Sequence, residues 1–373
     1  MEKRIMVAGH LCVDITPVFP EGKNGPLSDY LIPGRLLHMN PAAIHTGGAV
    51  ANTGLALKKL GADVRLVGKV GKDAFGDLVL GLMRKYGADG DVLVDERDST
   101  SYTIVIAPPG VDRIFLHNPG ANDSFCADDI PDSMLSDVAL FHFGYPPIMR
   151  KMYLEGGAEL LKLFRRVREK GIAVSLDLAA VDEESEAAKT DWRRFLERTL
   201  PYVDFFVPSA EELCGMLDKE RYREWMRRSH GGDVTKILRP EEDIRPLARE
   251  AMALGARIVL VKCGASGMYY CTGTRETLAG LPQAAGIDAE SWHGREGFQK
   301  CYVPARVRSG TGAGDVSIAA FLLAALRGYS AEQCVRLAAA EGASCVEEFD
   351  ALSGVRTLEE LEEKIRGGWE QQM

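Results

Sequence analysis

Hydrophobic positions follow two alternating patterns along most of the chain. Residues 5–8 form a short apolar run of the kind that makes a buried strand, whereas apolar positions in residues 50–61 recur at helical spacing until Gly61. Because segments of these two kinds alternate, the chain predicts βαβ units and a doubly wound, mainly parallel α/β sheet. The further strands that we expect lie at 63–71, 172–178, 203–209 and 256–264, and the further helices at 73–87, 156–171, 210–217 and 244–255.

Three segments depart from this alternation. Residues 101–122 contain two β-rich runs joined by Pro-Pro-Gly, which predicts a hairpin, and residues 11–46 are rich in proline and glycine with few helix signals. We expect residues 11–46 and 97–122 to form a small β lid on a single domain that spans residues 1–373. Residues 219–242 are strongly charged, and we interpret them as a solvated helical insertion rather than a surface for nucleic acid.

Composition and charge narrow the class of protein. The 373 residues are 46% hydrophobic and 27% charged, and the net charge of -9 argues against a nucleic-acid or anionic-membrane binder. The eight cysteines and seven histidines are dispersed, so we expect free thiols and no structural zinc site. His10 and Asp14 interrupt the first apolar stretch, which is too short for a signal peptide or a membrane span, so we expect a cytoplasmic protein.

A loop with almost no side chains precedes an acidic residue at the start of an apolar helix. The loop contains Gly312, Ala313 and Gly314, and the acid is Asp315. Backbone N–H groups in the first turn of a helix are unsatisfied and bind anions, so the loop could hold a phosphoryl group. Asp315 could then orient an attacking hydroxyl and accept its proton, or it could be only an acid favoured by the helix dipole.

A second glycine-rich stretch opens an earlier helix. Gly47 and Gly48 allow a polar ligand to reach the backbone, and Asn52 lies within the turns that follow. Asp14, which follows the first strand, could hold two sugar hydroxyls at once. The alternatives are structural: a tight turn for the glycines, a solvated or capping amide for Asn52, and a turn acid for Asp14.

Two long motifs resemble signatures of the ribokinase (PfkB) family of carbohydrate kinases. Residues 47–77, GGAVANTGLALKKLGADVRLVGKVGKDAFGD, are similar to the N-terminal signature, and residues 309–326, SGTGAGDVSIAAFLLAAL, to the C-terminal one. The elements between them follow the family's order, so the resemblance covers essentially the whole chain. It implies a ribokinase-like fold and a kinase that uses ATP and Mg²⁺ to phosphorylate a hydroxyl of a sugar or sugar-like molecule.

The resemblance also assigns roles to individual residues. Asp315 matches the general base, and residues 312–314 match the anion hole beside it. Where the family has Asn-x-x-Glu, this chain has Ser209 in place of the asparagine and keeps the glutamate as Glu212. The structural alternative for Glu212 is an acid on the exposed face of a helix. The family's substrate-binding positions fall on Asp14, Gly47, Gly48 and Asn52, its nucleotide loop on Gly264 and Gly267, and its magnesium-linked glutamate on Glu212.

Two further stretches differ from the family pattern. Ser309 and Gly310 replace an Asp-Thr pair whose aspartate commonly helps to hold a monovalent cation, so the resemblance implies little dependence on potassium here. In the family's Asp-x-Asn stretch, Asp177 is retained but Ala179 is apolar. Neither change affects the matched base or the matched anion hole.

The sequence leaves the substrate and the assembly open. A nucleoside kinase of the same fold and a non-catalytic sugar or nucleotide sensor are the alternatives, although the intact Asp315 disfavours the sensor. We expect His117, Asn118, Asn122 and Tyr145 to shape the pocket, but these residues do not name the sugar. The expected partners are ATP and a small sugar, with no nucleic acid or membrane, and a homodimer that pairs through the lid.

Overall fold

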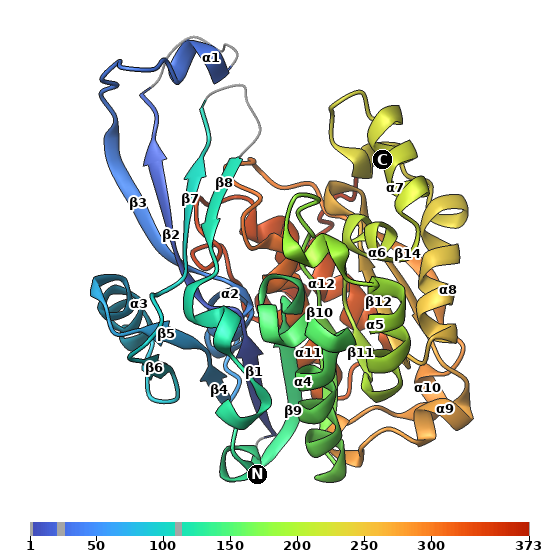
Figure 1. The fold of residues 1–373 in the computed structure, drawn as a ribbon. Coiled ribbons are helices and arrows are strands. Elements are labelled where there is room, and N and C mark those ends of the chain that lie inside the picture. The colour runs from blue at the N-terminus through green and yellow to red at the C-terminus, as the bar shows by residue number, and fades with distance from the viewer. Residues whose placement is uncertain (1–2, 21–26, 109–113, 373) are drawn as a thin grey trace.

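An eight-stranded sheet forms the centre of the computed structural model, which describes residues 3–20, 27–108 and 114–372 (Figure 1). Its strand order is β14-β13-β12-β11-β10-β9-β1-β4. Neighbouring strands from β12 to β4 pair parallel, whereas β13 pairs antiparallel with both β12 and β14. The predicted doubly wound, mainly parallel sheet is therefore confirmed. The strands are β1 (Arg4–Gly9), β4 (Val64–Val67), β9 (Val138–Gly144), β10 (Ala173–Asp177), β11 (Phe205–Phe206), β12 (Ile258–Lys262), β13 (Gly267–Thr272) and β14 (Glu296–Lys300).

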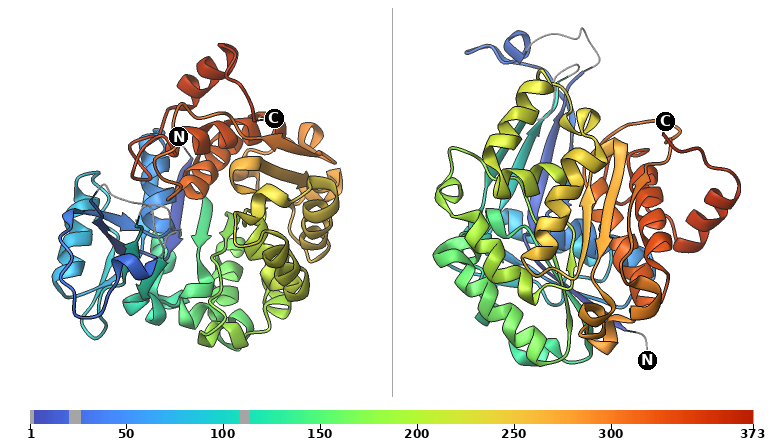
Figure 2. Two further views of the ribbon diagram at one scale, coloured as in Figure 1. Left: turned by 90° about the horizontal axis from the view of Figure 1, so that it is seen from above. Right: turned by 90° about the vertical axis from the view of Figure 1, so that its right-hand side faces the viewer.

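Helices cover both faces of this sheet (Figure 2). Alternate residues of β1 enter different cores, because Ile5 and Val7 pack on one face and Met6 and Ala8 on the other. The first core includes α2 (Ala49–Lys59), α11 (Ala313–Leu326), α12 (Ala331–Cys345) and α13 (Leu358–Arg366). The second includes α4 (Arg150–Glu169), α5 (Trp192–Thr199), α6 (Ala210–Leu217), α7 (Lys219–Arg228) and α8 (Arg245–Ala253). Shorter or peripheral helices are α1 (Leu27–Tyr30), α3 (Ala74–Arg84), α9 (Arg275–Ala279) and α10 (Ala289–Trp292).

A second, four-stranded sheet projects beyond the carboxyl ends of the main strands (Figure 1). Its order is β3-β2-β7-β8, with β2 (Cys12–Val18), β3 (Asn40–Gly47), β7 (Tyr102–Ile106) and β8 (Ile114–Asn118). These strands come from the two ranges that the sequence assigns to the lid, 11–46 and 97–122. Strands β7 and β8 pair antiparallel as the predicted hairpin requires, although residues 109–113 of its turn lie outside the described residues.

The strand predicted at residues 63–71 is divided in two. It contributes β4 to the main sheet and β5 (Lys69–Gly71) to a small sheet with β6 (Leu93–Asp95). Gly68 separates them, and a Cβ placed on Gly68 would lie 2.7 Å from the Cβ of Leu11. The chain therefore leaves the main sheet at a point where it passes close to another segment, which no local pattern reveals.

The helix predicted at residues 156–171 begins earlier and is broken. Helix α4 begins at Arg150, and the residues from Leu154 to Gly157 leave helical geometry. Glu155, Gly156 and Gly157 have left-handed φ values of 53°, 63° and 79°. The two glycines that start the predicted helix are therefore a kink within the observed one, since glycine accepts this conformation at little cost.

The charged segment 219–242 is helical in its first part, as predicted, but it is not wholly solvated. Helix α7 places Trp225 in the second core, with only 1% of its surface exposed. A short 3-10 turn, Val234–Ile237, follows it. Trp225, with the partly buried Tyr222 packed against the same core, therefore anchors a segment that is rich in charged side chains.

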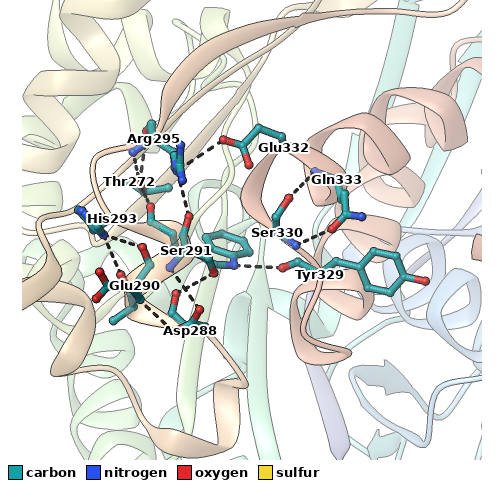
Figure 3. A network of polar contacts seen from close by, with 12 residues as sticks. Thr272, Asp288, Glu290, Ser291, His293, Arg295, Tyr329, Ser330, Glu332 and Gln333 are labelled. Carbon is teal, nitrogen blue, oxygen red and sulfur yellow. Dashed lines mark hydrogen bonds and ion pairs between the residues drawn. The ribbon is translucent and has the colours of Figure 1, made fainter.

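Polar contacts fasten β13 to the start of α12 (Figure 3). The backbone N–H of Arg295 donates to Oγ1 of Thr272 at 2.9 Å, and the Arg295 guanidinium pairs with Glu332 at 3.7 Å. Ser330 caps α12 by accepting from the backbone of Gln333. Because α12 packs on α11, these contacts also help to fix the helix that carries Asp315.

All eight cysteines are free thiols. In the part of the chain that the structure describes, no helix is both long enough and apolar enough to cross a membrane.

Candidate active site

Side chains from several elements gather at the carboxyl ends of the parallel strands. His10 follows β1, Tyr145 follows β9, Asp177 ends β10 and Lys262 ends β12, while Asp315 lies in the first turn of α11. Strand order reverses between β1 and β9, and doubly wound sheets bind their ligands at the carboxyl ends beside such a reversal. The fold therefore places these residues where a ligand is expected.

The carboxylate of Asp315 is buried and has hydrogen-bond donors from three side chains within reach. Asn52 donates to Oδ2 at 3.1 Å, and the Thr53 hydroxyl donates to Oδ1 at 3.2 Å. The Tyr145 hydroxyl lies 2.7 Å from Oδ1 and 2.8 Å from Oδ2. Only 5% of the residue is exposed, so these three side chains fix the direction of the carboxylate.

Burial raises the pKa of Asp315 above the ordinary aspartate value, because the charged form loses its hydration. The positive charge of Lys262 and the hydrogen bond from Tyr145 act in the opposite direction and limit the rise. A carboxylate with a raised pKa takes up a proton more readily than an exposed one. The environment therefore suits a proton acceptor.

The loop before Asp315 forms the N-terminus of the 14-residue helix α11. Gly312 is its N-cap with φ of 75°, and a Cβ there would lie 2.2 Å from the Cβ of Ala351. The Ala313 amide makes only a long contact of 3.4 Å with the carbonyl of Gly310, which a better acceptor can replace. With Gly314, these residues present the first-turn amides on which anion binding depends.

Gly47 and Gly48 are required by close contacts near the predicted sugar site. A Cβ on Gly47 would lie 2.2 Å from Oδ2 of Asp14, and one on Gly48 would lie 2.4 Å from the carbonyl of His10. Gly48 also has φ of 87°, where other residues are strained. Both glycines thus allow neighbouring groups to approach the backbone, and Gly47 brings Asp14 against the start of α2.

Asn52 has a partner that the sequence did not indicate. Its amide donates to Asp315 and is only 8% exposed, so it contacts the proposed base, and its role in binding sugar stays a prediction. Asn52 also lies beside the loop, because a Cβ on Gly312 would be 3.7 Å from its Cγ. The contact joins α2 to α11 directly.

A polar cluster surrounds Asp14 on β2. Cys12 donates its thiol to Oδ1 at 3.3 Å, and burial raises the pKa of Asp14. Thr103 contacts His117 at 3.1 Å, and the His117 ring lies 5.2 Å from that of His10. Both ring nitrogens of His10 are buried without a hydrogen-bond partner, and burial lowers its pKa, so the ring is neutral. Unpaired buried nitrogens of this kind are available to a polar ligand.

Two asparagines expected at the pocket have other contacts. Asn122 accepts from the backbone N–H of Leu11 at 3.1 Å and donates to its carbonyl at 3.0 Å. Asn118 donates to Ser99 at 3.4 Å. Asn122 therefore braces the segment between β1 and β2, and its place at the pocket stays a prediction.

Glu212 has a structural contact at the start of α6. Ser209 and Glu212 form a reciprocal cap, in which the backbone N–H of Ser209 donates to the glutamate at 2.7 Å. The serine that replaces the family's asparagine is thus explained by capping. Glu212 nevertheless interacts electrostatically with Lys262 and Asp177, so its charge belongs to the same cluster as Asp315.

Gly264 and Gly267 flank the turn between β12 and β13, where both adopt positive φ. A Cβ on Gly264 would lie 2.6 Å from Oγ1 of Thr235, and one on Gly267 would lie 2.1 Å from the carbonyl of Gln299. Ser266 of the same turn donates to the carbonyl of Thr235 at 3.0 Å. The charged segment 219–242 therefore contacts the predicted nucleotide loop.

The family model for pfkB carbohydrate kinases matches residues 3–358. The chain belongs to this family. It is therefore a carbohydrate kinase, a phosphotransferase that takes an alcohol group as acceptor.

Other pfkB-like proteins are similar over nearly their whole lengths. An uncharacterised sugar kinase from Archaeoglobus fulgidus is 24% identical over 301 residues, which cover 81% of this chain and 98% of the relative. Ribokinase of Arabidopsis thaliana, solved with ribose and ATP, aligns with a TM-score of 0.68 and 20% identity over 97% and 98% of the two chains. Fructokinase of Xylella fastidiosa, solved with ATP, aligns with a TM-score of 0.69 and 20% identity over 98% of this chain and 99% of the fructokinase. These likenesses confirm the ribokinase-like fold.

Two residues of this pfkB kinase site were missed at the sequence level. Lys262 donates to Asp177 at 2.7 Å, and Thr53 binds Asp315 beside Asn52. A signal for Lys262 exists, because it is the lone cation at the end of an apolar strand, directly before the predicted nucleotide loop. Thr53 gives no such signal, since its contact depends on how α2 packs against α11.

Proposed function

We propose that this carbohydrate kinase transfers the γ-phosphoryl group of ATP to a hydroxyl of a sugar or sugar-like small molecule. The observation that carries the proposal is the position of Asp315, a buried carboxylate in the first turn of α11, directly behind the anion-binding loop. A base and an anion site within one helical turn suit an in-line phosphoryl transfer. The substrates named for the ribokinase and fructokinase relatives support a sugar acceptor.

Asp315 acts as the general base in this proposal. The acceptor hydroxyl takes the donor position now held by Tyr145 and passes its proton to the carboxylate as its oxygen attacks the γ-phosphorus. The bond between the γ-phosphorus and the bridging oxygen breaks, and ADP leaves. Amides of Gly312, Ala313 and Gly314 stabilise negative charge on the group in transfer.

Glu212 is the proposed link to Mg²⁺. Among the described residues no group of three or more His, Cys, Asp or Glu side chains forms a metal site, but Mg²⁺ in kinases uses one or two carboxylates with the phosphates. One charged glutamate in the cluster around Lys262 fits that requirement. When bound, the ion would neutralise charge on the β- and γ-phosphates.

Asp14 and the neutral rings of His10 and His117 form the proposed sugar side of the site. Asp14 can accept from two hydroxyls, and a neutral imidazole can donate or accept. The four-stranded sheet that carries Asp14 is the proposed lid, and its closure would exclude water from the transfer. Gly264 and Gly267 shape the proposed nucleotide loop on the other side of Asp315.

The lid sheet is also the proposed dimer interface. Its exposed large apolar side chains are Val18, Ile44, Phe115 and Leu116, and the segment between β2 and β3 adds Leu31, Ile32 and Leu36. An edge strand with exposed apolar residues such as β8 favours pairing with a second copy. Sedimentation of Leu116→Glu is expected to show a monomer where the unmodified protein is a dimer, and an unmodified monomer would refute the interface.

A substrate panel tests the function. Purified protein with ATP and Mg²⁺ is assayed for ADP release with single sugars and with nucleosides, and Asp315→Asn is assayed beside it. We expect ADP release with at least one sugar and a fall in kcat of about 100- to 10,000-fold in the variant, the range of general-base catalysis. A variant that kept the wild-type rate would remove Asp315 from the role of base, and a response to nucleosides alone would reassign the acceptor.

A further inference from the structure

Lys262 lies beside the proposed phosphate site rather than in the structural core. Its side chain, at the carboxyl end of β12, is only 12% exposed. A Cβ placed on Gly314 would be 3.4 Å from Cδ of Lys262 and 3.8 Å from Nζ. The lysine side chain therefore borders the space that a side chain on Gly314, the last glycine of the proposed anion-binding loop, would occupy.

The charges around this lysine show that it stays protonated. Burial by itself lowers the pKa of Lys262, but the carboxylates of Asp177 and Glu212 outweigh burial and raise it. Asp315 acts in the same direction. One ammonium thus faces three carboxylates, and a γ-phosphate entering this region would add further negative charge.

The positive charge that such a phosphate requires is not supplied by the segment before the loop. Ser309 stands where the family commonly has the aspartate of a monovalent-cation site. The nearby Arg308 pairs with Glu348 at 3.3 Å and lies over the ring of Phe349 at 5.0 Å. Lys262, held by Asp177, is a buried cation that lies beside the loop itself.

We propose that Lys262 is a catalytic residue that binds the γ-phosphoryl group during its transfer, and that Asp177 holds the ammonium in place until ATP arrives. The inference rests on the proposed function. Lys262 stays protonated and forms no covalent bond, because it exchanges one anionic partner, Asp177 at 2.7 Å, for a phosphate oxygen. Preorganised cations of this kind act most strongly where water is excluded.

Asp177 is suited to losing its partner. Its side chain is 1% exposed, and burial raises its pKa, while Lys262 opposes the rise. When the ammonium turns to phosphate, the carboxyl group can take up a proton instead of staying as a bare buried charge. If the ion pair were purely structural, removing Lys262 and removing Asp177 would disturb the site to the same extent.

Nucleotide affinity separates these two roles. Calorimetry with Mg²⁺ and no sugar gives the affinities for the β,γ-imido analogue of ATP and for ADP, whose ratio measures the contribution of the γ-phosphate. In Lys262→Met we expect this ratio to fall at least about tenfold, the value of a charge-assisted contact, while the ADP affinity stays nearly unchanged. Lys262→Arg should keep part of the ratio, and the matched control Lys72→Met, which removes an exposed lysine paired with Glu96, should keep all of it.

The partner variant and turnover complete the test. Asp177→Asn frees the ammonium, so the analogue-to-ADP ratio should be kept or raised, and Lys262→Met should lower kcat by about 100- to 1,000-fold. If Lys262→Met does not fold, the double variant Lys262→Met/Asp177→Asn removes both buried charges and should show the same loss of ratio. An unchanged ratio in Lys262→Met or in the double variant, or an equal loss in Asp177→Asn, overturns the proposal.

A failure of the proposed function would look different. The ratio is measured without sugar, so it does not depend on the identity of the acceptor. Asp315→Asn should keep the ratio and lose turnover, whereas Lys262→Met should lose both. If no sugar is phosphorylated but the ratio falls in Lys262→Met, the proposed acceptor is wrong and the phosphate contact stands.

Discussion

The Tyr145 hydroxyl lies between the two carboxylate oxygens of Asp315, at 2.7 Å and 2.8 Å. It therefore occupies the direction from which an acceptor hydroxyl would donate its proton. Tyr145 has a left-handed φ of 70°, which is uncommon for a non-glycine residue, and Pro146 and Pro147 follow it. Unfavourable backbone geometry at a site of this kind is typical of functional positions.

Removing this hydroxyl should change how the rate depends on pH. The hydrogen bond from Tyr145 lowers the pKa of Asp315, so Tyr145→Phe should raise that pKa further. A base must be deprotonated to act, and therefore the acid limb of the kcat/KM profile, which reports the enzyme before the sugar replaces Tyr145, should move to higher pH. Rates from pH 4 to 8 at low sugar concentration and saturating ATP measure the shift.

The control for this experiment is Tyr86→Phe, which changes an exposed tyrosine on the segment after α3. Its profile should overlay that of the unmodified enzyme. An acid limb that stays in place, or moves to lower pH, in Tyr145→Phe would show that the hydroxyl does not act on the protonation of the base.

Asp14→Asn tests the sugar side of the site. The substitution keeps the shape but removes the charge and one acceptor, so sugar hydroxyls lose a buried partner that is worth about 1–3 kcal/mol. We expect KM for the sugar to rise about 10- to 100-fold, which is the same energy expressed as affinity. Calorimetry with nucleotide alone should show little change, and a loss of nucleotide affinity with normal sugar KM would place Asp14 in the nucleotide site.

Gly312→Ala should damage the start of α11. The residue has φ of 75°, and a new Cβ would lie 2.2 Å from the Cβ of Ala351. Gly328 is a matched control, because its φ is 83° and a Cβ there would have nothing within 4 Å. Gly328→Ala thus reports the backbone cost alone, about 1–2 kcal/mol.

We expect Gly312→Ala to lower the free energy of unfolding by more than the control does and to reduce kcat, because the clash moves the anion-binding amides. Urea unfolding and initial rates measure both effects. Equal losses of stability with an unchanged kcat in the two variants would mean that the loop accommodates the methyl group without moving.

Activity should depend little on potassium. Ser309 offers a neutral hydroxyl where the family's cation site has a carboxylate, so the full charge of that ligand is missing. Initial rates in KCl and in tetramethylammonium chloride, at equal ionic strength and saturating Mg²⁺, should agree within about twofold, far below the effect of losing one preorganised charge. A large rate increase specific to K⁺ over Na⁺ would show that backbone carbonyls alone form the site.

Local features of the site could be predicted from the sequence, and contacts between distant elements could not. Residues 312–315 form one motif, GAGD, and their geometry depends on a single helix start. The hydrogen bond from Asn52 to Asp315 joins residues 263 positions apart, so the sequence placed Asn52 at the sugar without any sign of its partner. Lys262 and Asp177 are likewise 85 positions apart.

The fold shows the same division. The alternating periodicities predicted the parallel sheet, because each strand and helix must bury its own apolar face. The break at Gly68 depends on the approach of Leu11, and the kink in α4 depends on glycines that also fit a helix start. Glu212 illustrates a local pattern with two meanings, since Ser-x-x-Glu is a capping box whether or not the glutamate also faces a metal.

The hydrogen bonds from Asn52 and Thr53 to Asp315 join the helix that starts at the proposed sugar site to the helix that starts at the proposed phosphate site. A sugar that reorients α2 must therefore change the energy of the proposed anion-binding loop, and a nucleotide that reorients α11 must change the energy of the proposed sugar site. Such an exchange is a heterotropic coupling free energy, and it is reciprocal. If bound sugar changes the affinity for ATP by a given factor, bound ATP must change the affinity for the sugar by the same factor.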